Sequence, residues 1–134
     1  MKKETVAQIF NYIGSKARMV NTLSHLIPNH CTTYAELYCG SGALALNSRK
    51  FDVKILNDFN PHIANFWRVA TDPETRGNLL KKIQTTHYSW YAFQEAKQRQ
   101  NDYGANQADR FQWALDTFIL NRQSFNGDGR NWVY

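Results

Sequence analysis

Two patterns of apolar and polar residues follow one another along the 134-residue chain, and the change comes near residue 72. Before it, apolar runs over 33–38 and 51–56 have the length and the bounding turn residues of short strands. Apolar residues spaced three and four positions apart predict helices around them, over about 16–27, 43–49 and 61–70. This order of elements is the beginning of a parallel α/β sheet.

The predicted helices have recognisable ends. Ser15 suits the N-cap of the first helix, and Pro28 ends that helix. Asn60 followed by Pro61 is a cap residue with a first-turn proline, which predicts the start of the third helix.

After residue 72 the pattern becomes helical. Three stretches have helical spacing: about 74–85, 88–100 and 106–121. The last of them has an apolar stripe of four side chains: Phe111, Leu115, Phe118 and Ile119. A loop rich in turn formers follows over 121–130, and 131–134 indicates the start of a strand. We therefore divide the chain into an α/β part, 1–72, and a helical part, 73–134.

Composition and charge narrow the class of protein without deciding it. No apolar run approaches the ~18 residues that span a bilayer, and no signal-peptide stretch follows the first residues, so we expect an intracellular, cytoplasmic protein. Two cysteines and four histidines without ligand-like spacing predict neither a disulfide framework nor a metal site. The net charge of +5 fits an anionic partner such as nucleic acid, but many proteins with this charge bind none.

Residues 40–45, with the sequence GSGALA, stand between the first predicted strand and a helix and fit the pattern G-x-G-x-x-G/A. Asp58 closes the second strand, where a ribose-binding carboxylate is expected. Glycines in such a turn let a ligand approach the backbone, and a carboxylate can accept both ribose hydroxyls. A tight turn beside a solvated Asp58 is the alternative interpretation.

Glu36 bears on which nucleoside cofactor would bind. It lies at the end of the first predicted strand, where a dinucleotide would place its diphosphate nearby. Two negative charges facing each other there would be unfavourable. An ammonium group suits this carboxylate better, and S-adenosyl-L-methionine carries one on the same adenosine scaffold. The pattern therefore favours S-adenosyl-L-methionine over NAD.

Four blocks of sequence, spread over nearly the whole chain, fit the motifs of one known family in order. YIGSK (12–16) fits aromatic-x-Gly-Gly/Ser-Lys, and AELYCGSGALALN (35–47) fits E-P-F-x-G-[SA]-G-x-x-x-L-N, with Leu37 in place of the usual proline. LNDFNPHIANFW (56–67) fits N-D-x-N-x-x-L-x-x-x-[YF], and LNRQSFNGDGR (120–130) fits L-N-[RK]-x-x-[FY]-N-G-x-x-R. In this combination the chain resembles the Dam-type adenine-specific DNA methyltransferases.

The resemblance implies an α/β fold, the front half of a Rossmann-like S-adenosylmethionine-dependent methyltransferase sheet followed by a helical target-recognition insertion. Lys16 would approach the methionine carboxylate or the catalytic acid, the alternative being an exposed first-turn lysine. Phe59 would stack on the adenine of the cofactor, or else lie in the core. The cofactor-binding residues implied are Tyr12, Gly14, Lys16, Glu36, Tyr38, Gly40, Gly42, Asp58 and Phe59.

The resemblance also implies that double-stranded DNA binds at the loop over 121–130. The residues implied are Asn121, Arg122, Phe125, Asn126 and Arg130, the first two bracing or contacting the loop. An aromatic side chain can wedge into a base stack, while Asn can read adenine and Arg can read guanine. Asp128 stands where the family is often apolar, so the DNA sequence preference is expected to differ. A capped helix end with an exposed arginine is the alternative.

The family's catalytic motif, Asp/Asn/Ser-Pro-Pro-aromatic, is absent. The prolines of the sequence are Pro28, Pro61 and Pro73, and no two are adjacent. We therefore predict no catalytic residue and expect a truncated methyltransferase portion without turnover by itself. An unpaired sheet edge would remain, which favours a complementing chain with the catalytic motif, or self-association.

Two other functions stay open at the level of sequence. One is a non-catalytic DNA-binding remnant of a methyltransferase, which would show salt-dependent DNA binding without cofactor affinity. The other is an NAD-type nucleotide-binding protein, which would prefer NAD to S-adenosylhomocysteine.

Overall fold

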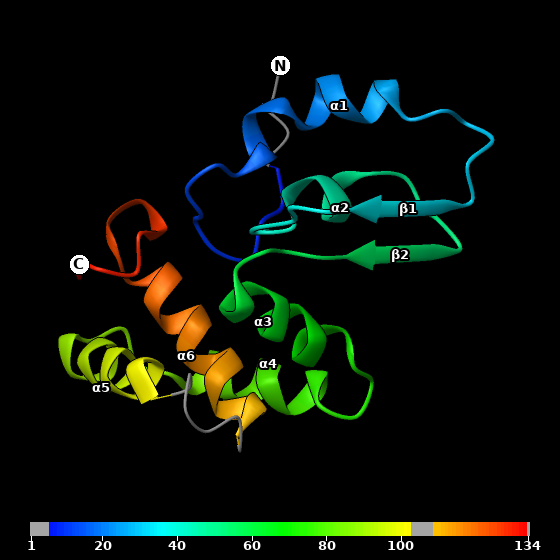
Figure 1. The fold of residues 1–134 in the computed structure, drawn as a ribbon. Coiled ribbons are helices and arrows are strands. Elements are labelled where there is room, and N and C mark those ends of the chain that lie inside the picture. The colour runs from blue at the N-terminus through cyan, green and yellow to red at the C-terminus, as the bar shows by residue number, and fades with distance from the viewer. Residues whose placement is uncertain (1–5, 103–108, 134) are drawn as a thin grey trace.

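The computed structural model describes residues 6–102 and 109–133. Its elements are the 3-10 helix η1 (Lys16–Met19), α1 (Val20–Leu26), β1 (Thr33–Glu36), α2 (Ala43–Asn47), β2 (Val53–Leu56), α3 (Pro61–Thr71), α4 (Arg76–Thr85), α5 (Trp90–Asp102), α6 (Arg110–Arg122) and the 3-10 turn η2 (Phe125–Gly127). The strands and helices α1 and α2 form one tier, and helices α3 to α6 form a second tier below it (Figure 1).

The two strands of the described residues pair in parallel, with Thr33 opposite Val53 and Glu36 opposite Leu56. The predicted parallel pairing is confirmed, although both strands are shorter than the apolar runs that predict them. Beyond β1 the strands stay linked, because the Asn57 N–H donates to the Glu36 carbonyl at 2.9 Å before the chain turns. The wider Rossmann-like sheet stays a prediction.

The two faces of the sheet have different surroundings. On one face, Tyr34 packs with Leu44 of α2 and Leu23 of α1 in a small apolar cluster. On the other face, Val53 and Ile55 are 49% and 51% exposed. The described part of the chain therefore leaves one face of the sheet open.

Helices α3, α5 and α6 form the main core. Helix α6 packs along both α3 and α5, and α4 contacts α3 and α6. Phe66 of α3, Phe93 of α5 and Leu120 of α6 are almost completely buried in one cluster. Cys39, which follows β1, belongs to the same cluster, so the turn after β1 is built onto the helical core.

A buried carboxylate joins α5 to α6. Asp116 has no exposed surface and accepts hydrogen bonds from Arg99 Nε at 2.9 Å and Arg99 Nη2 at 2.8 Å. Gln112 Nε2 donates to the same carboxylate at 2.9 Å. Bidentate bonds between a guanidinium and a carboxylate are strong and directional, so these bonds fix how α5 lies on α6.

The capping residues predicted from the sequence are the ones observed at the first and third helices. Asn60 caps α3 by accepting from the His62 N–H at 3.0 Å, and Pro61 occupies the first turn. Ser15 caps the first helix as predicted, but residues 16–19 form a 3-10 turn before α1 begins. Side chains in that short turn are largely exposed, so little packing supports an extra α-helical turn.

The helical stretches predicted after residue 72 correspond to α4, α5 and α6. The predicted start of the last stretch, at 106–108, lies outside the described residues, as does Tyr134. The strand indicated at 131–134 amounts to one antiparallel bridge between Ser124 and Trp132. No helix of the described ranges is long and apolar enough to cross a bilayer.

Candidate cofactor and DNA-binding site

The turn after β1 contains two glycines with left-handed backbone, Gly40 at φ +48° and Gly42 at φ +69°. A Cβ atom at Gly40 would lie 2.7 Å from the ring of Tyr12, and one at Gly42 would lie 2.3 Å from the ring of Trp67. The sequence pattern predicts that these glycines let a ligand approach the backbone. In the structure, two aromatic rings already occupy the space that a side chain would need.

Two side-chain hydrogen bonds hold this glycine turn in place. Trp67 Nε1 donates to the Gly40 carbonyl at 2.8 Å, and the hydroxyls of Ser41 and Ser15 lie 2.9 Å apart. Helix α3 and the YIGSK segment are therefore both attached to the turn. Sequence analysis does not single out Trp67 for this role, because its partner is 27 residues away along the chain.

Asp58 lies directly beside the glycine turn, at the end of β2. Its Oδ2 accepts the Gly40 N–H at 2.8 Å, and its Oδ1 accepts the Asn60 N–H at 3.0 Å. Each carboxylate oxygen can accept a second hydrogen bond, and the side chain is only partly buried. Asp58 is therefore held rigidly and can still receive the hydroxyls of a ligand.

Glu36 is a buried carboxylate with incomplete hydrogen bonding. Tyr34 donates its hydroxyl to Oε2 at 3.0 Å, while Oε1 is buried and receives no hydrogen bond from the described residues. Lys16 Nζ stands 3.0 Å from Oε1 as an ion pair without hydrogen-bond geometry, and it also donates to the Tyr38 carbonyl. Burial, followed by the charge of Glu36, raises the pKa of Tyr34 far above its usual value.

The charges of both carboxylates affect the pKa of the Cys39 thiol. Burial raises the pKa of its thiol to about 12, and the negative charges of Asp58 and Glu36 contribute to the rise. Both acids therefore act on one buried sulfur next to Gly40. Neither Glu36 nor Asp58 lines any of the four main cavities of the described residues, so the shared hollow beside Gly40 stays a prediction.

The remaining residues of the implied cofactor site lie at the surface. Tyr38 and Phe59, which follow β1 and β2, are 70% and 91% exposed. The alternative that Phe59 lies in the core is therefore wrong. Gly14 is exposed with φ +82°, and Lys16 is tied to Glu36, not free as an exposed first-turn lysine would be.

The loop that follows α6 is closed by its own hydrogen bonds. The Phe125 N–H donates to the Asn131 carbonyl at 2.8 Å, and the Gly129 N–H donates to Ser124 Oγ at 2.8 Å. Gln123 bridges to the segment before α5, with bonds to the Ser89 N–H at 3.2 Å and the His87 carbonyl at 3.0 Å. This loop, 123–133, is therefore preorganised.

The implied DNA-binding residues divide into two groups. Phe125 is 60% exposed at the tip of the loop, where Asn126 has the left-handed φ of +52°. Arg122 and Arg130 are exposed as well. Asn121 is 8% exposed and donates to the Thr117 carbonyl at 2.8 Å, so it braces the helix end from inside.

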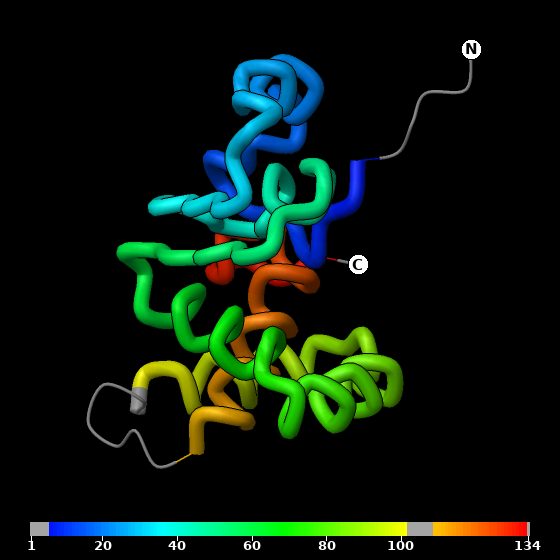
Figure 2. The backbone as a smooth tube through the Cα atoms, turned by 90° about the vertical axis from the view of Figure 1, so that its right-hand side faces the viewer, coloured from blue at the N-terminus to red at the C-terminus, as the bar shows by residue number. Residues whose placement is uncertain are grey.

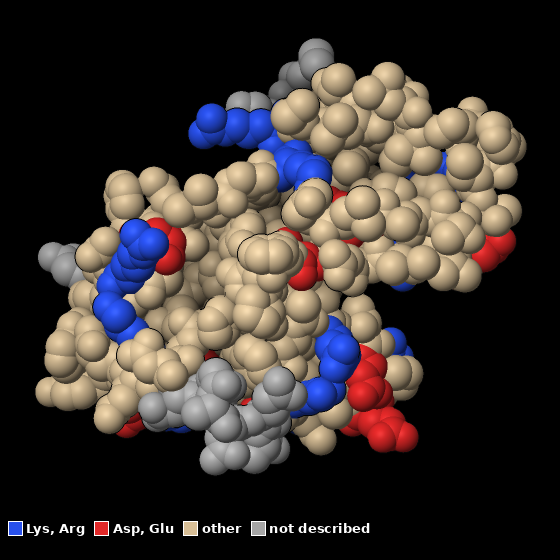
Figure 3. Space-filling model, in the orientation of Figure 1, with Lys and Arg blue, Asp and Glu red and all other residues tan. Residues whose placement is uncertain are grey.

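Charge is spread over the molecule. Figure 3 shows the Lys and Arg side chains of one face in several separate groups, some with acids beside them. In the loop, Asp128 accepts from the Arg130 N–H at 2.8 Å, and this bond is the main cause that lowers the pKa of its carboxyl. Asp128 therefore shapes the backbone before Arg130.

The loop and the first segment of the chain touch each other. A Cβ at Gly127 would lie 2.0 Å from the Asn11 carbonyl oxygen, which explains the glycine. Figure 2 shows the C-terminal segment (red) at the level where the strands meet the helices. Beside this contact is a cavity of about 370 Å³, which we call the junction cavity; Tyr12, Asn60, His62, Leu120, Asn121 and Asp128 are among the residues that line it.

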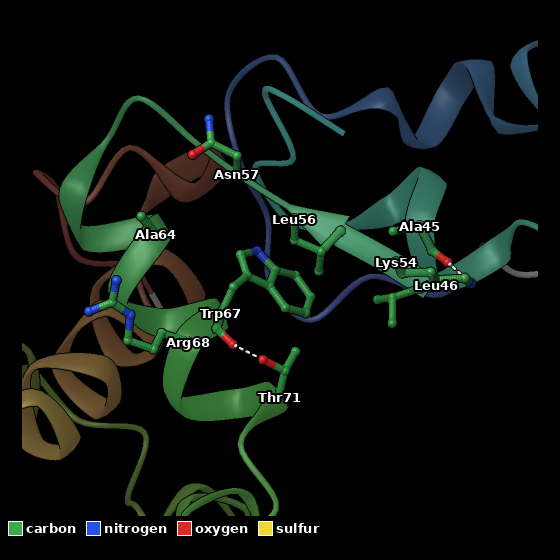
Figure 4. Close-up of a pocket in the computed structure, with 9 residues that line it drawn as sticks. All are labelled: Ala45, Leu46, Lys54, Leu56, Asn57, Ala64, Trp67, Arg68 and Thr71. Carbon is green, nitrogen blue, oxygen red and sulfur yellow. Dashed lines mark hydrogen bonds between the residues drawn. The ribbon is translucent and has the colours of Figure 1, made fainter. Parts of the chain in front are cut away.

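A larger cavity, of about 570 Å³, lies along β2 on the side of α3. Figure 4 shows the indole of Trp67 pointing from α3 towards β2, where Lys54 and Leu56 contribute to the wall. Lys54 Nζ donates to the Ala45 carbonyl at 2.7 Å. Of the residues assigned to the cofactor in the sequence, none lines this cavity.

A parallel β–α–β unit with a glycine turn after its first strand and a carboxylate after its second is the architecture of nucleoside-cofactor-binding proteins. The family model of the D12 class N6 adenine-specific DNA methyltransferases matches residues 12–130. The match covers most of the chain, and the chain belongs to this family.

A similar protein of known name agrees with this family assignment. The chain is 26% identical to the modification methylase StsI of Streptococcus sanguinis over 91 residues, which are 66% of this chain and 13% of the relative. The matched region is thus a small part of that longer protein.

Proposed function

We propose that the chain is the cofactor-binding and target-recognition portion of a DNA adenine-N6 methyltransferase that uses S-adenosyl-L-methionine. Family membership supports the class of enzyme. The observation that carries the cofactor proposal is the pair of carboxylates after the two strands: Asp58 accepts the Gly40 N–H at 2.8 Å, and Glu36 is buried with one oxygen that receives no hydrogen bond from the described residues.

The residues present fit the cofactor. Glu36 Oε1 is a buried acceptor without a hydrogen bond from the described residues, and an ammonium group would supply one. Lys16 stands 3.0 Å from that oxygen, so the two side chains together complement a group with an ammonium and a carboxylate. Asp58, held by two backbone N–H groups, would accept the ribose hydroxyls. When bound, the cofactor supplies a methyl group on a sulfonium centre.

In this proposal, the exposed rings of Tyr38 and Phe59 cover the nucleoside at the surface. Tyr38 lies in the turn after β1 and Phe59 in the turn after β2, and both side chains are largely exposed. Tyr12, whose ring packs over Gly40, forms the side of the site nearest the DNA loop.

For DNA, we propose that Phe125 and Asn126 enter the base stack while Arg122 and Arg130 contact phosphates or guanine. The closed hydrogen bonding of the loop supports this role, because a preorganised loop loses less conformational entropy on binding. The relative is named a modification methylase, and the family acts on adenine in DNA, so modification of DNA is the biological role that we propose. A DNA substrate would place that activity inside the cell.

We infer that these 134 residues alone do not transfer methyl groups, because they contain no Pro-Pro motif. The catalytic motif would come from a complementing segment. The unpaired edge of the two-stranded sheet supports this part of the proposal, since the described chain adds no third strand. Self-association through the same edge is the competing outcome.

Calorimetric titration with S-adenosylhomocysteine and with NAD, each with and without duplex DNA, tests the proposal. We expect binding of S-adenosylhomocysteine, no binding of NAD, and salt-dependent DNA binding. DNA binding without affinity for either cofactor would instead establish a non-catalytic DNA-binding remnant. Methyl transfer by the purified chain to unmethylated DNA would contradict the inferred lack of turnover.

A further inference from the structure

Tyr34 and Glu36 lie two residues apart on the same face of β1. Alternate residues of a strand point to the same side of the sheet, and here both side chains are buried, with Tyr34 9% and Glu36 5% exposed. The Tyr34 hydroxyl donates to Glu36 Oε2 at 3.0 Å. A donor from the interior of the fold therefore binds the carboxylate that we assign to the cofactor.

The ring of Tyr34 is fixed by packing. It stacks on Phe51, with the ring centroids 5.2 Å apart and an angle of 24° between the planes, and it packs with Leu44 in the small apolar cluster on that face of the sheet. A phenylalanine would fill the same space, and a buried hydroxyl costs free energy unless it is hydrogen-bonded. What the hydroxyl adds to the packing is therefore the bond to Glu36.

The two oxygens of Glu36 have different surroundings. Oε2 is held by Tyr34, on the side of the apolar cluster. Oε1 stands 3.0 Å from Nζ of Lys16, whose side chain is 31% exposed, and it receives no hydrogen bond from the described residues. A carboxylate oxygen can accept two hydrogen bonds. The remaining capacity of Glu36 is therefore on the side of Lys16, away from Tyr34.

The hydroxyl of Tyr34 sets the plane of this carboxylate. The terminal torsion of a glutamate side chain has a broad distribution, so packing alone leaves the carboxylate free to turn. A hydrogen bond from a fixed donor to Oε2 also determines where Oε1 lies, because both oxygens belong to one rigid group. The buried Tyr34 thus acts on a ligand through Glu36 and not by contact.

We propose that Tyr34 is a positioning residue, whose hydroxyl turns the carboxylate of Glu36 so that Oε1 meets the ammonium group of S-adenosyl-L-methionine. Tyr34 would thereby favour nucleosides that carry an amino group over those that do not. The inference rests on the proposed cofactor-binding function and adds the interior residue on which Glu36 depends.

Tyr34→Phe removes the hydroxyl and keeps the ring, and two ligands separate the ammonium group from the nucleoside. S-adenosylhomocysteine carries this group, whereas methylthioadenosine is the same adenosine thioether without the amino acid part. By titration calorimetry of the 134-residue chain, we expect Tyr34→Phe to bind S-adenosylhomocysteine about fivefold more weakly than the wild type, which corresponds to about 1 kcal/mol. Its affinity for methylthioadenosine should be unchanged, because that ligand does not use Glu36.

Tyr88→Phe is the matched control. It also removes a hydroxyl that donates a hydrogen bond, here to the Val133 carbonyl at 2.7 Å, but Tyr88 lies in the helical part, before α5. We expect this variant to bind both ligands as the wild type does. An equal loss of affinity for both ligands in Tyr34→Phe would indicate a loosened site and would overturn the proposal.

The outcomes separate this inference from the proposed function. No binding of S-adenosylhomocysteine by the wild type would overturn both. Binding by the wild type with equal affinity of Tyr34→Phe would overturn the positioning role alone. Should Tyr34→Phe fail to fold, the ring resonances of Tyr34 in the wild type decide. They are expected to shift with S-adenosylhomocysteine and not with methylthioadenosine, and a shift with neither ligand or with both would overturn the proposal.

Discussion

Two buried carboxylates, one at each end of the molecule, show how differently the two ends are built. Asp116, in the helical end, accepts three hydrogen bonds from Arg99 and Gln112 and has no exposed surface. Glu36, at the glycine turn, is also buried but has one oxygen without a hydrogen bond from the described residues. The first carboxylate is satisfied within the fold, and the second has capacity left for a ligand.

The burial of apolar side chains also differs between the helical end and the sheet. The helical end buries Phe66 and Phe93 almost completely, while the open face of the sheet leaves Val53 and Ile55 about half exposed. Stability is therefore concentrated in helices α3, α5 and α6. The residues that we assign to the cofactor lie on a less buried unit attached to that core through Trp67. A change of Asp116 should accordingly affect folding, and a change of Glu36 should affect binding.

The largest effect is expected from Asp116→Ala. Removing this carboxylate leaves the guanidinium of Arg99 without its bidentate partner. Because the Arg99 side chain is 38% exposed and can be hydrated, we expect the free energy of unfolding to fall by about 2–4 kcal/mol. Urea unfolding followed by tryptophan fluorescence measures the change. A loss below about 1 kcal/mol would contradict the assignment of Asp116 as the structural carboxylate.

Gly42→Ala should damage the glycine turn next most strongly. A left-handed backbone costs an alanine about 1–2 kcal/mol, and the contact with Trp67 adds about 1–3 kcal/mol of overpacking. Gly77→Ala is the matched control, since its Cβ would meet nothing within 4 Å in α4 and alanine favours a helix. Thermal unfolding should show a lower Tm for the first variant and an equal or higher Tm for the second.

Phe125→Ala should weaken DNA binding without changing the stability of the fold. The ring is 60% exposed, so little packing is lost, whereas a stacked aromatic contributes about 1–3 kcal/mol per base to binding. Fluorescence anisotropy should show about 5- to 150-fold weaker binding to duplex DNA. Leu26→Ala, another exposed apolar side chain, serves as control on α1, and equal losses in both variants would argue against a specific role of the loop.

A smaller effect concerns the reactivity of the cysteines. Because its pKa is raised to about 12, the Cys39 thiol stays protonated at pH 8, and the thiolate is the form that reacts. Iodoacetamide should label the partly buried Cys31 in the folded protein and both cysteines in guanidinium. Asp58→Asn should speed labelling of Cys39, because it removes a charge that raises this pKa. Equal native labelling rates for the two cysteines would count against the paired acids.

Local signals in the sequence predict the elements well. The cap at Asn60 and the parallel pairing of the strands can be anticipated because both depend on neighbouring residues or on a simple apolar pattern. The glycine turn can also be anticipated, because a turn depends on local residues. Gly40 and Gly42 have the positive φ values that such a turn requires.

Contacts between distant segments could not be anticipated in this way. The ring of Trp67 under Gly42, the ion pair of Lys16 with Glu36 and the placement of His62 beside Asn121 all depend on tertiary packing. Sequence spacing gives the same weight to a glycine that faces a ligand and to one that faces an aromatic ring. The structure separates these cases because it shows which neighbour fills the space.

Titration calorimetry of the chain and of Glu36→Gln with S-adenosylhomocysteine tests the central claim most directly. If Glu36 Oε1, which is ion-paired with Lys16 but receives no hydrogen bond from the described residues, accepts the ammonium group, the wild type binds. Glu36→Gln then loses about 10- to 100-fold in affinity, as expected for a hydrogen bond to a charged group worth about 1.5–3 kcal/mol. Its Tm should stay within a few degrees of the wild type. Equal affinity of the two proteins, or no binding by the wild type, would contradict the claim that this carboxylate is kept for a ligand.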